Sequence, residues 1–382
     1  MKMKMKHTIW KKTGAVITAL ALAIGCLFAV PVTAQAAEYS ITPISAVLYT
    51  GSGAELFSQP DPSTVVTVLP GDMPVQITGA TSNGYFQVIV NDGIYYIYGK
   101  ALSAATGTTA YKLTSIDARS ALVGDAATGQ LIYAQNPYER LAPASTTKIM
   151  TVLLVMDAIA QGQLALDTPL VVSPTAVAGI PSDASHVSPR IRAGEVMNVL
   201  ELLECVMLSS DCHACNVLAE AVAGSVSNFV VMMNARAAAL GCTETNFVNT
   251  SGYPEANHYT NAYSLFLITK EAYKYPVFQT IAAMPAAVIP ATNLAPARNL
   301  ETTNALMKAS EYYNPYAIGV KTGSAQSSGL CLVGAARKGD KTVITVVLGA
   351  ANKLMSDGTK KKLQFSETNK LIDMGLANTA NN

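Results

Sequence analysis

The stretch 141-LAPASTTKIM-150 places a lysine three residues after a serine, at the start of a run of apolar residues. The run continues to Met156, and its pattern predicts a buried helix from residue 146 to about 161. A lysine in a buried helix is costly unless its amine is paired or its charge is tuned. Lys148 therefore requires a chemical partner, and Ser145 is the nearest candidate.

The spacing of Ser145 and Lys148 fits a nucleophile with its base. The two residues are one helical turn apart and share a face, so the amine can approach the hydroxyl. Free backbone N–H groups at the helix start favour negative charge there. A serine hydroxyl needs a base, and a lysine serves once burial or another cation lowers its pKa. A capping serine beside a snorkelling lysine has the same spacing, so this motif alone does not decide.

Two further motifs favour the catalytic interpretation. The segment 208-LSSDCHACNVLAE-220 is a serine-containing turn between two predicted helices, and 321-KTG-323 starts a predicted hairpin. The order S-x-x-K, S-x-N, K-T-G is typical of penicillin-interacting serine enzymes. The second motif is then Ser210-Asp211-Cys212, with Cys212 where asparagine is usual. The alternative Ser209-Ser210-Asp211 fits the following helix less well.

Longer segments carry the same resemblance over residues 117–376. They are 119-RSALVGDAATGQLIYAQNPYERLAPASTTKIMT-151, 246-NFVNTSGYPEANHYTNAYSL-265, 302-TTNALM-307 and 317-AIGVKTG-323. This region is similar to the D-alanyl-D-alanine carboxypeptidase family of low-molecular-mass penicillin-binding proteins. The resemblance implies that the chain removes the terminal D-Ala from peptidoglycan stem peptides, that β-lactam antibiotics acylate it, and that no cofactor or metal takes part.

The resemblance also implies a role for each motif residue. Ser145 attacks the carbonyl of the penultimate D-Ala, Lys148 takes its proton, and Ser210 relays a proton to the leaving amine. The backbone N–H groups of Ser145 and Ser324 hold the oxyanion, and Gly323 leaves the strand edge bare for the peptide. The remaining members of the expected substrate site are Lys321 and Thr322, for the terminal carboxylate, and Cys212, whose thiol is a weaker donor and acceptor than an amide.

The periodicity of the same region predicts an α+β fold, an antiparallel sheet with a helical cluster of the β-lactamase/transpeptidase type. Two strands surround a turn in 120–136, and three more are expected at 316–324, 328–337 and 341–350. The helices expected after the first are 195–207, 212–222, one capped by Ser225, and 363–376.

The N-terminal third of the chain has a different organisation. Residues 1–36 combine five lysines, an apolar run and a small-x-small ending, which predicts a signal peptide and a secreted or wall-associated protein. A retained anchor and a lipoprotein at Cys26 are the alternatives. Residues 38–103 alternate short β-rich runs with turns and resemble a bacterial SH3-like module, which is either a wall-peptide binder or a spacer. Residues 104–116 form the expected linker and 377–382 a tail.

Charge and cysteine content exclude several classes of function. Without residues 1–36 the net charge falls from +1 to −4, and no basic tract remains, so nucleic acid is not an expected partner. No later apolar run is long enough to span a membrane. The five cysteines after residue 36 are odd in number and do not suggest a disulfide framework. The C-H-A-C sequence at 212–215 has no second ligand pair, which favours buried thiols over a metal site.

Four other functions were weighed against the carboxypeptidase. A DD-transpeptidase would share every motif and pass the acyl group to an amine. A β-lactamase would also share the three motifs. One class of β-lactamases needs a glutamate-bound water to release the acyl group, but no E-x-x-L-N-like stretch lies between Ser210 and Lys321. A non-catalytic wall-binding protein would not need Ser145 and Lys148. A Ser-His-Asp hydrolase lacks its G-x-S-x-G motif, and His186, His213 and His258 are expected on the surface or in loops.

Overall fold

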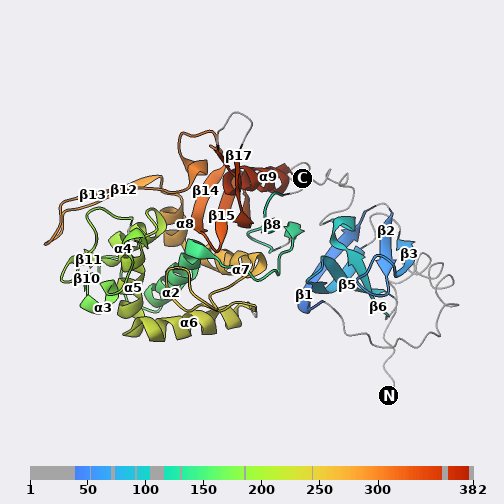
Figure 1. Cartoon of the computed structure of the whole chain (residues 1–382), viewed down its shortest axis with the longest axis horizontal. Helices are drawn as coiled ribbons and strands as arrows, with labels where there is room; N and C mark the ends of the chain where they lie inside the picture. Colours follow the sequence, from blue (N-terminus) through green and yellow to red (C-terminus); the bar gives the residue numbers. More distant parts are fainter. Residues whose placement is uncertain are drawn as a thin grey trace, which may run out of the picture. The chain divides into compact units, whose positions relative to one another are not determined.

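The computed structural model describes residues 39–51, 53–69, 74–90, 93–103, 116–129, 131–184, 186–242, 244–354 and 360–377. The chain forms two compact units, Met1–Ala101 and Leu102–Asn382 (Figure 1). The predicted signal peptide, almost all of the predicted linker and all but the first residue of the predicted tail lie outside the described residues.

The first unit is built on a sheet in the strand order β3-β2-β6-β5-β4-β1-β7, whose last strand, β7, lies just past the boundary at Ala101. The core is formed by Leu56, Ile77, Val88 and Ile97, which are fully buried. The alternation of β-rich runs and turns predicted for residues 38–103 agrees with the strands described here. The likeness of this unit to SH3-like modules remains a prediction. The strands are β1 (Ile41–Thr50), β2 (Ala54–Phe57), β3 (Val65–Leu69), β4 (Pro74–Thr81), β5 (Tyr85–Val90), β6 (Gly93–Tyr98) and β7 (Leu102–Ser103), with η1 (Gly99–Ala101) before β7.

The second unit is built on a five-stranded antiparallel sheet in the order β14-β15-β16-β8-β9. Strands from both ends of the unit meet in it, because β16 pairs with β8. Strand β14 is at the edge of this sheet and carries the K-T-G motif. The strands are β8 (Ser120–Asp125), β9 (Leu131–Gln135), β14 (Ala317–Ala325), β15 (Gly329–Lys338) and β16 (Lys341–Ala350). The predicted α+β architecture is confirmed.

Helices cover both faces of this sheet. Helix α9 (Leu363–Ala377) packs on one face through Leu371 and Ile372, and the other helices form the cluster on the opposite face. They are α2 (Lys148–Ala160), α3 (Pro174–Val177), α4 (Val199–Met207), α5 (Cys212–Ala223), α6 (Val226–Ala239), α7 (Ala262–Ala272) and α8 (Pro276–Ala282), with the short turns η2 (Ala144–Thr147), η3 (Ser182–Ala184) and η4 (Ala305–Met307).

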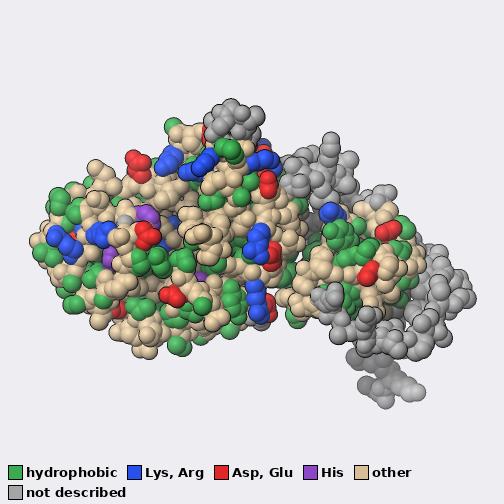
Figure 2. All heavy atoms as spheres, in the orientation of Figure 1, with side chains coloured by type: hydrophobic (Ala, Val, Ile, Leu, Met, Phe, Trp, Pro, Cys, Tyr) green, Lys and Arg blue, Asp and Glu red, His purple; other side chains and the backbone are tan. Residues whose placement is uncertain are grey.

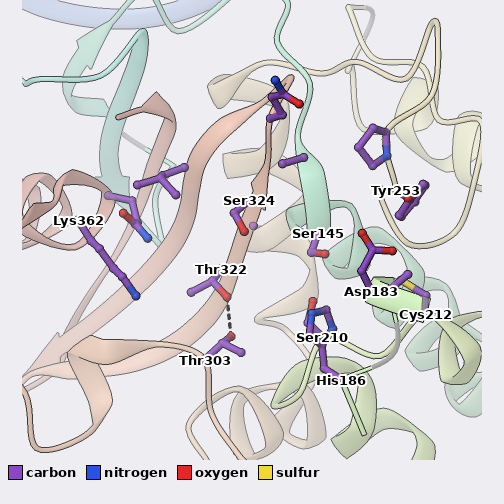
Figure 3. Close-up of a pocket in the computed structure, with 18 of the residues that line it drawn as sticks. Ser145, Asp183, His186, Ser210, Cys212, Tyr253, Thr303, Thr322, Ser324 and Lys362 are labelled. Carbon is purple, nitrogen blue, oxygen red and sulfur yellow. Dashed lines mark hydrogen bonds between the residues drawn. The ribbon is translucent and has the colours of Figure 1, made fainter. Parts of the chain in front are cut away.

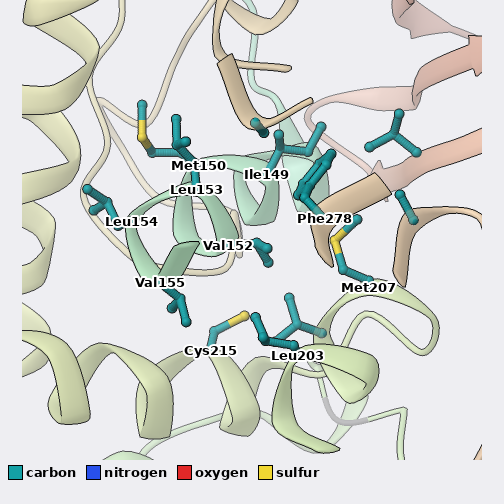
Figure 4. Packing of buried hydrophobic residues seen from close by; sticks show 14 of the residues in the cluster. Ile149, Met150, Val152, Leu153, Leu154, Val155, Leu203, Met207, Cys215 and Phe278 are labelled. Atoms are coloured by element: carbon teal, nitrogen blue, oxygen red, sulfur yellow. The ribbon is translucent and has the colours of Figure 1, made fainter. Parts of the chain in front are cut away.

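Helix α2 is surrounded by other elements, which explains its apolar sequence. Figure 4 shows Val152 and Val155 near Leu203 of α4 and Cys215 of α5, while Ile149 lies near Phe278 of α8. A helix buried on all sides is apolar all round, as predicted from the run after Lys148. Of the described helices, none is by itself long and apolar enough to cross a membrane; only α5 and α6 together, bent by 83°, reach that length and composition.

One predicted helix boundary is wrong. Residues 196–198 form strand β11 (Val196–Asn198), paired with β10 (Pro169–Val171), and α4 starts only at Val199. The Asn198 side chain accepts a hydrogen bond from the Glu201 N–H, and the Glu201 carboxylate accepts one from the Asn198 N–H. This capping box marks the start of α4. The predicted cap at Ser225 is confirmed, because its hydroxyl accepts from the Asn228 N–H. Two further hairpins are β12 (Ala286–Ile289) with β13 (Arg298–Glu301) and β17 (Asn352–Leu354) with β18 (Lys360–Lys362).

Candidate active site

Ser145 lies on a tight turn held between two glycines. It is in η2, just before α2, and the preceding Ala144 has a left-handed φ of 48°. A Cβ atom on Gly323 of β14 would come within 3.0 Å of the Ser145 nitrogen, and one on Gly252 within 1.8 Å of the Ala144 oxygen. The glycine of the K-T-G motif thus lets the sheet edge run directly against the nucleophile turn.

Lys148 is fully buried and its amine has three partners. It donates to the Ser145 hydroxyl at 2.9 Å, to the Ser251 carbonyl at 2.8 Å and toward the Cys212 sulfur at 3.5 Å. The sequence therefore predicted the Ser145–Lys148 contact correctly, but not the carbonyl. Ser251 comes from the loop 246–260, more than a hundred residues away, and no local pattern could reveal it.

The turn between α4 and α5 brings the second motif to the same place. Ser210 has a left-handed φ of 62°, and Asp211 caps α5 by accepting from the Ala214 N–H at 3.0 Å. Ser210 and Cys212 line the cleft beside Ser145, whereas the described lining includes neither Ser209 nor Asp211. This geometry favours Ser210-Asp211-Cys212 as the motif over its one-residue shift.

Lys321 lies differently from the sequence-based expectation. Its side chain is 1% exposed, and its amine donates to the Thr322 carbonyl at 3.1 Å. Burial and the nearby Lys148 cation lower the pKa of Lys321 to about 7. Among the described residues that line the cleft, Thr322 is included but Lys321 is not. The Lys321 amine is thus buried and bonded to a backbone carbonyl, outside the described lining of the cleft.

The cleft has a volume of about 640 Å³ and runs along β14 (Figure 3). Thr303, Thr322 and Lys362 lie on one side of Ser145, and Cys212, Asp183 and Tyr253 on the other. The Thr322 hydroxyl is hydrogen-bonded to that of Thr303. The cleft also takes in Ala184, His186, Ser210, Gly252, Pro254, Gly323, Ser324, Ala325, Gln326, Leu330, Asn352, Gln364 and Phe365.

Lys362 belongs to a lysine-rich hairpin that the sequence analysis did not use. Lys353, Lys360, Lys361 and Lys362 all lie on β17 and β18, and Figure 2 shows basic side chains gathered around this part of the surface. Lys362 pairs with Asn352, and both reach the cleft. The run of three lysines just before the last helix was the feature of the sequence that could have indicated a basic surface here.

Two of the three histidines expected on the surface or in loops are buried. His213 is 6% exposed on α5, and His258 is 5% exposed on the loop 246–260. His258 accepts from the Val248 N–H through Nδ1 at 3.2 Å and bonds the Thr147 hydroxyl through Nε2 at 2.9 Å. Burial and the Lys148 cation lower the pKa of His258 to about 4. The expectation is wrong for His213, which is buried on helix α5; His258 does lie in a loop, which folds back over the nucleophile turn, and His186 is exposed in the lining of the cleft.

The five cysteines after residue 36 are all free thiols and all buried. Within the described parts of the chain, no three histidine, cysteine or acidic side chains are grouped so that they could hold a metal ion. Cys212 differs from the others because it contacts Lys148 and lines the cleft.

A sheet flanked by helices, with a Ser–Lys pair against its edge strand, defines a penicillin-interacting serine enzyme. The chain belongs to the D-alanyl-D-alanine carboxypeptidase family, whose sequence pattern matches residues 106–352.

Relatives include the D-alanyl-D-alanine carboxypeptidase DacF of Bacillus subtilis, 35% identical over 62% of this chain and 58% of its own length. The chain therefore spans little more than half of that relative. The D-alanyl-D-alanine carboxypeptidase of Streptomyces sp. K15 is 34% identical over 72% of this chain and 92% of its own. A crystal structure titled Streptomyces K15 DD-transpeptidase matches 69% of this chain and 98% of its own with a TM-score of 0.60 and 28% identity.

Proposed function

We propose that this chain is a serine-type D-alanyl-D-alanine carboxypeptidase that removes the terminal D-Ala from peptidoglycan stem peptides. The observation that carries the proposal is the 2.9 Å contact between the buried Lys148 amine and the Ser145 hydroxyl, in a cleft along the edge strand of the family fold. β-Lactam antibiotics acylate the same serine.

Acylation begins when Lys148 takes the proton of Ser145 and the hydroxyl oxygen attacks the carbonyl of the penultimate D-Ala. The Ser251 carbonyl keeps the amine in place while the proton moves. The oxyanion lies between the backbone N–H groups of Ser145 and Ser324, each worth about 3–4 kcal/mol in the transition state. The close approach of Gly323 to the Ser145 nitrogen supports this pairing of donors.

Ser210 carries the proton onward to the departing D-Ala amine. It lines the cleft beside Ser145, on the rigid turn capped by Asp211. Lys321, whose pKa is lowered to about 7, gains and loses a proton readily near neutral pH and can return a proton to Ser210. Water then attacks the acyl-enzyme, and Ser145 is regenerated.

The terminal carboxylate of the substrate binds at the Thr322 end of the cleft. Thr322 and Thr303 offer hydroxyl donors, and Lys362 is the cation among the described lining residues. This replaces the expected direct clamp by Lys321, whose buried amine is bonded to a carbonyl instead.

A transpeptidase is the second candidate, because Cys212 takes the place of a stronger hydrogen-bonding amide. A thiol positions the substrate amide less firmly, which alters the partition of the acyl-enzyme between water and an amine. The structurally similar Streptomyces K15 protein carries both descriptions, carboxypeptidase and DD-transpeptidase. A β-lactamase would have to release its acyl-enzyme rapidly.

We also propose that the protein works outside the cytoplasm, at the cell wall. The support is the sequence of residues 1–36 and the substrate itself, which is a wall component. The β-rich unit at 38–103 would then hold the enzyme close to the wall, either by binding wall peptides or as a spacer.

Mass spectrometry of the intact protein after incubation with a penicillin tests these alternatives. A carboxypeptidase or transpeptidase gives a stable adduct on Ser145, absent in Ser145→Ala, and release of D-Ala from a D-Ala-D-Ala peptide. Added glycine or another amine separates the two, since a transpeptidase yields the amide product. An adduct lost with drug turnover indicates a β-lactamase, and no adduct indicates a binding protein.

A further inference from the structure

The cleft carries side chains of opposite charge on the two sides of Ser145. Among the described residues that line it, the acidic side chain is Asp183 and the lysine or arginine side chain is Lys362. Figure 3 shows them on opposite sides of Ser145: Lys362 on the side of Thr322 and Thr303, and Asp183 on the side of Cys212 and Tyr253. A ligand that fills this cleft meets a cation at one end and an anion at the other.

The edge strand fixes which end of a peptide meets which charge. Strand β14 has a sheet partner, β15, on one side only, so an extended peptide can add to its free edge. The terminal carboxylate belongs at the Thr322 end, as the proposed function requires. The scissile carbonyl is then at Ser145, and the residues before D-Ala-D-Ala run away from Lys362. Because Lys362 and Asp183 lie on opposite sides of Ser145, the inference places the side chain just before the two alanines on the side of the cleft that carries Asp183.

The Asp183 carboxylate is available for a ligand. It is on η3 and exposed, and no ion pair of Asp183 occurs among the described residues. Arg190 is close in sequence, but its guanidinium donates to the Ser182 carbonyl at 3.0 Å. An exposed carboxylate at the wall of a peptide cleft favours a cationic side chain by charge complementarity.

We propose that Asp183 makes the enzyme selective for stem peptides in which the residue before D-Ala-D-Ala carries a free side-chain ammonium group. The inference rests on the proposed function and adds its substrate class. Asp183 contacts the substrate amine and takes no part in the chemistry at Ser145. A stem peptide whose amine is already acylated, as in a cross-link, is the poorer substrate.

Two acetylated tripeptides test the inference: Nα-acetyl-L-Lys-D-Ala-D-Ala and its Nε-acetyl derivative, with released D-Ala as the readout. We expect the wild type to prefer the free amine by about threefold to fivefold in kcat/KM, the size of a solvent-exposed ion pair. The preference shrinks at high salt, because screening weakens exposed pairs. Asp183→Asn removes the preference for the free amine, and the exposed Asp167→Asn, outside the described cleft lining, is the matched control that keeps it.

Charge reversal adds a gain-of-function readout that a merely structural role would not give. Asp183→Lys should prefer an Nε-succinyl-lysine peptide over the free amine. Equal rates for the two acetylated tripeptides in the wild type, or a preference that survives in Asp183→Asn, would overturn the inference alone. Failure to release D-Ala from any peptide, together with no penicillin adduct, would overturn the proposed function and the inference with it.

Discussion

Replacing Lys148 by methionine separates its chemical role from its structural one. Methionine fills a similar volume but removes the base that contacts the Ser145 hydroxyl at 2.9 Å. General-base catalysis is worth about 100-fold to 10,000-fold, so acylation by penicillin should slow by that factor, or about 2.7 to 5.4 kcal/mol in the barrier. The assay is the rate of adduct formation on Ser145, followed by intact mass.

The same substitution should not destabilise the fold greatly. Lys148 is fully buried, and a methionine fills its place without a polar group that has to be desolvated. We expect the melting temperature of Lys148→Met to stay close to that of the wild type, and the exposed Lys338→Met to serve as a control. Acylation within threefold of the wild type in a folded Lys148→Met protein would refute the assignment of the base.

Three further substitutions have definite expected outcomes. Cys212→Asn should change the ratio of hydrolysis to amine transfer while sparing acylation; an unchanged ratio, measured by chromatography of both products, would remove the proposed role of the thiol. Lys321 has a pKa of about 7 in the folded protein against 10.5 when free, so its burial penalty is complete below about pH 7 and is relieved as the pH rises toward 10.5. Lys321→Met should therefore gain stability over the wild type mostly below pH 7, with thermal melts showing the gap closing by about pH 10. Arg298→Met leaves the fully buried Glu195 without its partner at 2.7 Å and should cost about 3–5 kcal/mol in urea unfolding, a loss that the double variant with Glu195→Leu should largely recover.

Elements with a strong periodic pattern were predicted well from the sequence. The hairpin strands β15 and β16 and the helices α2, α5 and α9 lie within one or two residues of their predicted bounds. The spacing of apolar residues in these elements predicts which side chains are buried, because each element packs a broad apolar face into the core. The start of α4 was misplaced because Val196 continues the apolar pattern although it pairs in a strand and is partly exposed.

Some contacts of the site follow from the sequence, and those with distant segments do not. The contact of Ser145 with Lys148 follows from one helical turn, and the motif at Ser210 from the order of the three motifs. His258 lies in a loop as expected, but its burial was not predicted, because that loop closes over the nucleophile turn. The residue pattern of a loop does not predict which part of the fold that loop packs against.

By itself, the sequence determined the contact between Ser145 and Lys148, because the two residues are three positions apart and one helical turn is enough to join them. Only the tertiary structure decided how the charged side chains are arranged around Ser145. Lys321 is a buried amine of lowered pKa, while Lys362 and Asp183 lie on opposite sides of Ser145 in the cleft. Burial and the field of distant charges are properties of the packed chain, and they depend on residues that sequence separates by up to two hundred positions.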